Sequence, residues 1–199
     1  MSSAYSTYAG PPEVGPIILP VAPLSTEQYL QMIEAGILDS SDKVELIGGQ
    51  ITPMAPAGPE HIGSVFELTT LFAPHVEKFV IAVQATVVIT EGQVLEPDIA
   101  LLTHRADQYK RALPRAADVL LIVESAASSL DKDRHVKLPI YAAAGIPEYW
   151  IVDLNNRTLE VYREPVGGAY SHSQKLAGDD RASPLACTEV SLRVGSLFA

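Results

Sequence analysis

The sequence has a single cysteine, Cys187, and few cations: 14 Lys and Arg stand against 24 Asp and Glu among 199 residues. One cysteine cannot form an intramolecular disulfide, and it excludes a zinc site built from several thiolates. The apolar runs, such as Val119–Val123, are far shorter than the roughly 20 residues that cross a bilayer. No basic segment followed by an apolar one opens the sequence. We therefore expect a cytoplasmic protein that does not enter a membrane.

The net charge of -10 argues at first against a nucleic-acid partner. The charges are unevenly distributed, however, because residues 105–137 contain 7 of the 14 Lys and Arg and only 5 acids. A nucleic acid would bind through this segment, and salt would weaken the binding. The alternative is a charged, solvated face that has no partner.

Hydrophobic residues make up 47% of the sequence, enough for one folded domain with a real core. Residues 1–24 are rich in proline and glycine and predict a flexible or extended arm, and residues 25–199 form the domain. Helical spacing predicts helices over residues 25–37, 60–76 and 132–144. Pro139 lies inside the last of these, so we expect a short helix, a kink or a break near His135 and Val136. Strands are expected over residues 44–47, 50–54, 79–89, 98–103, 119–123, 148–154, 158–163, 169–176 and 188–192.

Two carboxylates stand beside apolar segments of the strand type. Asp98 follows Pro97 and opens DIALL, and Glu124 ends VLLIV. A carboxylate at the end of so apolar a strand is costly unless it is paired or bound to a metal. Two acids at the ends of neighbouring strands, with a lysine close behind, can hold a divalent metal next to a phosphate. This pattern predicts an enzyme that hydrolyses phosphodiesters.

Further segments of the sequence match one family: VELIGGQI, MAPAGPEH, VQATVVI, EPDIALL, LLIVESAASS, DRHVKLPIYAAAGIPEYWIVDL and VYREP. In these the chain resembles the bacterial Uma family of endonucleases, which belongs to the PD-(D/E)XK superfamily. The resemblance covers about residues 25–199. It implies an α/β, restriction-endonuclease-like fold in which a central mixed sheet is flanked by helices, with the active site at the ends of the middle strands. It also implies Mg²⁺ as the cofactor, with Mn²⁺ as a substitute.

The resemblance assigns Asp98 and Glu124 as the catalytic acids and metal ligands. Two residues after Glu124 the chain has Ala126 where the superfamily has lysine. The resemblance supplies the catalytic lysine from the following helix, as Lys137. Three further residues are possible accessory residues of the site: His61, Glu45 and Gln84. Two cations, Lys132 and Arg134, are possible phosphate contacts.

Each of these residues also has a structural interpretation. Asp98 would then be a turn acid, and Lys137 a surface lysine or the partner of Asp133. His61 would cap or pack against a helix, and Glu45 would pair with an arginine. The residue types alone leave these alternatives open.

We expect a metal-dependent endonuclease that cleaves DNA. The SAASS segment after the glutamate, the displaced lysine and the acidic charge suggest an alternative, a module that has lost catalysis and binds nucleic acid or a protein partner. A small-molecule phosphodiesterase is a third interpretation. Because a duplex has two strands to cut, we also expect a homodimer, with the apolar arm packed across the partner.

Overall fold

The computed structural model describes residues 21–39 and 41–198. Most of the predicted arm lies outside these residues, so its boundary stays a prediction. The central sheet has six strands, β3 (Val80–Val83), β6 (Ile99–Leu102), β7 (Val119–Ala126), β8 (Glu148–Asp153), β9 (Thr158–Val166) and β10 (Ala169–Ala177). Their order is β10-β9-β8-β7-β6-β3. Strands β7 and β8 are parallel and the other described neighbours are antiparallel, which confirms the predicted mixed sheet.

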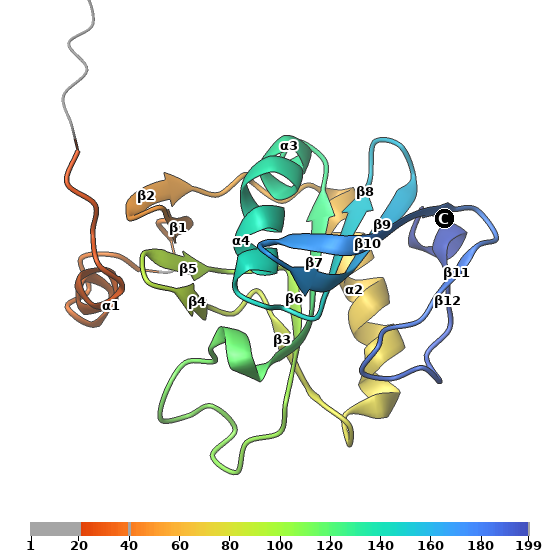
Figure 1. Ribbon diagram of the computed structural model, residues 1–199, viewed down its shortest axis with the longest axis horizontal. Coiled ribbons are helices and arrows are strands. Elements are labelled where there is room, and N and C mark those ends of the chain that lie inside the picture. Colours follow the sequence, from red (N-terminus) through yellow and green to blue (C-terminus); the bar gives the residue numbers. More distant parts are fainter. Residues whose placement is uncertain (1–20, 40, 199) are drawn as a thin grey trace, which may run out of the picture.

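The middle strands are mostly apolar because both faces of the sheet are covered (Figure 1). Helix α2 (Pro59–Phe72) packs on one face, where Phe72 joins a cluster with Val123 and Trp150. The helical segment after β7 packs on the other face, where Tyr141 joins Ile122 in a second cluster. The chain therefore forms an α/β domain whose sheet is flanked by helices.

A second sheet of four strands lies beside the first, with the order β2-β1-β5-β4. Its strands are β1 (Val44–Ile47), β2 (Gln50–Pro53), β4 (Val87–Thr90) and β5 (Gln93–Leu95). Helix α1 (Thr26–Glu34) packs on it through Tyr29, and a capping box joins Ser25 and Gln28 at its start. The turn between β1 and β2 needs glycine at Gly49, because its φ is 73° and a Cβ there would lie 2.5 Å from Pro23 Cβ.

Two predicted strands are wrong. Residues 79–89 do not form one strand, because Gln84 has a φ of 45° and the chain crosses there from β3 into β4 of the other sheet. Residues 188–191 contain no strand; instead β12 (Leu192–Arg193) pairs with β11 (Arg181–Ala182). Short 3₁₀ turns at Ala73–His75, Ala116–Asp118 and Val194–Phe198 complete the elements.

The helical segment after β7 is continuous but changes its pitch. It consists of α3 (Leu130–Lys132), a π-helical turn η3 (Asp133–Lys137) and α4 (Leu138–Ala143). Pro139 has no N–H to give to the carbonyl four residues earlier, and the wide turn directly precedes it. The expected irregularity near His135 is therefore confirmed, in the form of a π turn and not a break. Within the described residues, no helix is both long and apolar enough to cross a bilayer.

Candidate functional site

The two predicted acids meet where β6 begins and β7 approaches its end. The antiparallel register pairs Ile99 with Val123, so Asp98 and Glu124 occupy the next positions of the two neighbouring strands. Both side chains are buried, with 7% of Asp98 and 4% of Glu124 exposed. The backbone N–H of Ser125 donates to Asp98 Oδ2 at 2.8 Å and ties the two strands together at this point.

Asp98 also contacts two of the predicted accessory residues. Nε2 of His61 lies 2.8 Å from Asp98 Oδ1, and Nε2 of Gln84 lies 3.3 Å from the same oxygen. His61 comes from the first turn of α2, and Gln84 from the left-handed position that separates β3 from β4. The hydrogen bond to Asp98 raises the pKa of His61, although burial acts in the opposite direction. His61 and Gln84 therefore lie at Asp98, as the resemblance implies.

Glu124 is held by two donors from the helical segment that follows it. Lys137 Nζ lies 2.8 Å from Glu124 Oε1, and the hydroxyl of Tyr141 donates to the same oxygen at 3.0 Å. Lys137 is the last residue of the π turn, and Tyr141 follows one turn later. Ala126 is fully buried in the core at the end of β7. The lysine that contacts Glu124 therefore comes from the helix, and its catalytic role stays a prediction.

Glu45 is a residue of β1, and it is a second carboxylate in contact with Lys137. Its Oε1 is 2.9 Å from Lys137 Nζ, and its Oε2 is 2.8 Å from Lys132 Nζ. The backbone N–H of Glu96 also donates to Oε1, at 3.1 Å. Burial alone would raise the pKa of Glu45, but Lys137 and Lys132 outweigh it and the pKa is lowered. Glu45 thus holds the two lysines of the helix, where the structural interpretation expected an arginine.

Glu45, Glu124, Asp133 and Tyr141 form a buried cluster around Lys137. This cluster contains more carboxyl groups than cations. Burial raises the pKa of Glu124 to about 8, although the charge of Lys137 opposes this. Burial disfavours the ammonium of Lys137, but Glu124 and Glu45 outweigh it and raise the pKa of the lysine. Burial likewise raises the pKa of Asp133, which lies 3.9 Å from Lys137 Nζ. Lys137 is therefore a stable cation, and Glu124 and Asp133, unlike Glu45, keep a proton to higher pH than exposed carboxyls do.

Two members of the cluster, Asp133 and Tyr141, were not predicted as site residues. Both are buried, and they flank Lys137 at a spacing of four residues in each direction. Side chains at this spacing lie on one helix face. That spacing is the signal in the sequence by which they could have been found.

The two cations expected at the phosphate are engaged in ion pairs. Lys132 pairs with Glu45, as described above. The guanidinium of Arg134 lies 2.9 Å from Asp153 and 2.5 Å from Glu160, so it links the π turn to β8 and β9. Their role as phosphate contacts stays a prediction, and the observed contacts fasten the helix to both sheets.

The basic segment around Glu124 does not form a single patch. Arg105, Lys132, Arg134 and Lys137 each form an ion pair with a carboxylate. The remaining cations, at Lys110, Arg111 and Arg115, lie in the connection from β6 to β7. Because those strands are antiparallel, this connection lies at the end of the strands opposite to Asp98 and Glu124. The predicted local patch beside Glu124 is therefore wrong.

The carboxylate oxygens of Asp98 and Glu124 are ligands of the type that Mg²⁺ prefers. This ion needs only one or two protein carboxylates when waters and a substrate phosphate complete its coordination shell. A carboxylate offers about four lone-pair directions. Asp98 accepts three hydrogen bonds and Glu124 two, from the described residues. Across residues 21–39 and 41–198, no three His, Cys, Asp or Glu side chains are grouped so that they alone could hold a metal ion. The residues therefore fit a cation that is shared with a substrate.

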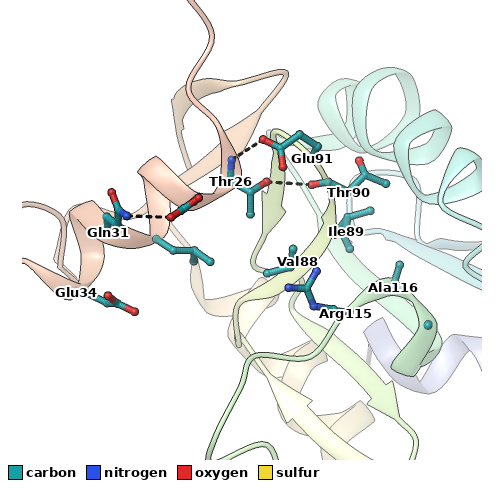
Figure 2. Close-up of a pocket in the computed structure, with 12 residues that line it drawn as sticks. Thr26, Gln31, Glu34, Val88, Ile89, Thr90, Glu91, Arg115 and Ala116 are labelled. Atoms are coloured by element: carbon teal, nitrogen blue, oxygen red, sulfur yellow. Dashed lines mark hydrogen bonds between the residues drawn. The ribbon is translucent and has the colours of Figure 1, made fainter.

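A separate groove with a volume of about 620 Å³ lies between α1 and β4 (Figure 2). Its lining includes none of the clustered carboxylates. The charged residues along it are Glu27, Glu34, Glu91 and Arg115. Three acids against one guanidinium do not favour a polyanion.

The raised pKa of Glu124 predicts how the stability of the metal-free protein depends on pH. Between the ordinary pKa of 4.5 and about 8, the folded protein keeps a proton that the unfolded chain has released. The free energy of unfolding should therefore fall as pH rises through this window, by up to about 1.4 kcal/mol per pH unit. Urea unfolding at several pH values, in EDTA, measures this slope. Glu124→Gln should reduce the slope, and an unchanged slope would show that Glu124 does not carry the proton.

The site can now be set beside known proteins. A family model described as "Uma2: Putative restriction endonuclease" matches residues 26–195. The crystal structure of a putative nuclease belonging to DUF820, from Anabaena variabilis, superposes with a TM-score of 0.72. The alignment covers 88% of this chain and 98% of that chain at 15% identity, and so shows a shared fold. No curated protein matches the chain. Because the family model covers most of the sequence and confirms the resemblance, the chain belongs to the Uma2 family of putative restriction endonucleases.

Proposed function

We propose that this protein is a divalent-metal-dependent endonuclease that hydrolyses phosphodiester bonds in DNA. The observation that carries the proposal is the pair of buried acids at the ends of β6 and β7, with Lys137 2.8 Å from Glu124. Family membership supports the same chemistry. Buried carboxylates gathered around one lysine are costly to maintain, and such groups are characteristic of functional sites.

In this proposal, Asp98 and Glu124 hold Mg²⁺ or Mn²⁺ against the scissile phosphate. A bound divalent cation would make water nucleophilic near neutral pH and neutralise charge on the phosphoryl oxygens. Lys137 stays protonated among its carboxylates, so it acts as a fixed positive charge and not as a proton acceptor. His61, with 19% of its side chain accessible, would meet the phosphate from the start of α2.

A homodimer belongs to the same proposal, because two copies of one site are needed to cut both strands of a duplex. Light scattering at micromolar concentration would measure the mass. A monomeric mass would remove the dimer from the proposal and leave the chemistry of the site untouched.

The proposal is tested by incubating the protein with plasmid DNA and Mg²⁺ or Mn²⁺, with EDTA as the metal-free control. We expect cleavage that EDTA abolishes and that Asp98→Asn removes while the protein stays folded by circular dichroism. Asn keeps the size of Asp98 and removes its charge, so the loss would report on the metal and not on packing. If folded Asp98→Asn cleaves as well as the parent, the proposed site is not the catalytic one. Turnover of bis-p-nitrophenyl phosphate without any on DNA would instead identify a small-molecule phosphodiesterase.

A second candidate function is a module that binds nucleic acid or a protein partner without cleaving. Lys132, Arg134 and Lys137 are each paired with a carboxylate. This pairing favours the non-cleaving module, because the three cations are not free to bind a substrate phosphate. A gel mobility assay in EDTA separates the two functions. Retarded DNA that is never cut in either metal would support the module, and cleavage that EDTA abolishes would exclude it.

A further inference from the structure

The hydrogen bonds to Glu124 all fall on one of its two carboxylate oxygens. Lys137 Nζ and the Tyr141 hydroxyl both approach Oε1, at 2.8 and 3.0 Å. No described residue donates a hydrogen bond to Oε2. Two donors, one of them charged, occupy the two lone pairs of Oε1 and fix the plane of the carboxylate.

The second oxygen retains contact with solvent. Among the described residues, the fully buried side-chain atoms without a hydrogen-bond partner are Thr158 Oγ1 and Tyr170 Oη. Glu124 Oε2 also has no donor but is not one of these atoms, so it is not completely enclosed. The small exposed fraction of this side chain, 6%, therefore includes the unpartnered oxygen. The carboxylate has an inner oxygen that is occupied and an outer oxygen that is available to a ligand.

The side chain of Tyr141 is held in place by burial and by packing against another aromatic ring. Its side chain is fully buried, and its ring packs edge to face on Tyr149 with a centroid separation of 4.9 Å. Tyr149 in turn stacks on Tyr162 at 6.1 Å, so a row of rings extends from the site across the sheet.

We infer that Tyr141 is a positioning residue for the metal ligand Glu124: together with Lys137 it occupies Oε1, so that Oε2 is the oxygen presented to the cation. This inference rests on the proposed function, because it concerns the same site. Without the phenol, Lys137 alone holds Oε1, the carboxylate can rotate, and either oxygen can turn toward the lysine. The cation would then meet a ligand that is no longer oriented in advance.

Tyr141→Phe tests the inference, since it removes the hydroxyl and keeps the ring. We expect calorimetry with Mn²⁺ alone to show roughly tenfold weaker binding, the lower end of the range for partners that orient a metal ligand. Tyr149→Phe is the matched control, because it removes a buried hydroxyl from the adjoining ring that contacts the Asp133 carbonyl and not Glu124. We expect it to bind Mn²⁺ like the parent. A near-ultraviolet tyrosine difference spectrum on Mn²⁺ addition should appear in the parent and be lost in Tyr141→Phe.

The outcomes separate this inference from the proposed function. Equal Mn²⁺ affinity in the parent and folded Tyr141→Phe, with no tyrosine spectral change in the parent, would overturn the positioning role and leave the metal site standing. Equal weakening in both phenylalanine variants would also overturn it, because the effect would then be one of packing. If the parent neither binds Mn²⁺ nor cleaves DNA, the inference and the proposed function are both overturned.

Discussion

Replacing Lys137 with methionine should lower the free energy of unfolding by about 3–5 kcal/mol at neutral pH. Only 6% of the lysine side chain is exposed, and its ammonium lies 2.8 Å from Glu124 and 2.9 Å from Glu45. Methionine fills the same space without the charge. Glu124 would lose its charged donor and Glu45 would keep only the partly exposed Lys132, and removing one partner of a buried pair leaves the other unsatisfied.

Urea unfolding of the parent and variant measures this loss. Lys175→Met is the matched control: Lys175 lies 3.6 Å from Glu160 with 54% of its side chain exposed, and an exposed pair contributes about 0–1 kcal/mol. The loss in Lys137→Met should be smaller at pH 5, where the unpaired carboxyls take up protons more readily. Adding Glu124→Gln to Lys137→Met should recover part of the stability. If Lys137→Met costs no more than Lys175→Met, the cluster is not held by this cation.

Glu124→Gln should reduce metal-dependent DNA cleavage by on the order of 10³-fold, which corresponds to about 4 kcal/mol of lost transition-state stabilisation. Glutamine keeps the shape of the side chain and one carbonyl oxygen that can accept from Lys137. It loses the negative charge that a divalent cation requires of a ligand at this position. The protein should therefore stay folded while cleavage and Mn²⁺ binding are both lost.

Glu67→Gln makes the same chemical change at an exposed position of α2 and should leave cleavage unaltered. Initial cleavage rates in Mg²⁺ and Mn²⁺, with Mn²⁺ affinity measured in parallel, check the prediction. Retained cleavage in Glu124→Gln would remove this residue from the metal site. Lost cleavage with unchanged Mn²⁺ affinity would move its role from holding the cation to another step.

The sequence predicted the middle of the central sheet well because β6, β7 and β8 contain short apolar runs bounded by turn residues. The neighbouring positions of Asp98 and Glu124 followed from the same pattern, since each acid adjoins such a run. The break at Gln84 was not predictable in this way. A continuous β-branched run conceals a single left-handed residue, and nothing in the local composition shows that the chain changes sheets there.

The surroundings of Lys137 were harder to predict than the lysine itself. Its partner Glu45 lies 92 positions earlier in the sequence, and only the packing of the two sheets brings them together. The ion pairs of Lys132 and Arg134 also depend on distant strands, so charge counted along the chain overstated the cationic character of this region. Tyr141 packs on Tyr149 of β8, and its hydroxyl reaches Glu124, a contact that the sequence pattern did not indicate.

The π turn has a consequence for how this chain can vary. A π turn contains about one residue more than the α turn it replaces, so every side chain after it is rotated around the helix axis. The orientation of Tyr141 relative to Asp133 therefore depends on the number of residues between them. His135 and Val136 are exposed, so we expect substitutions there to be tolerated, whereas deleting either residue should rotate Tyr141 relative to Glu124. In this stretch, chain length is constrained more strictly than residue identity.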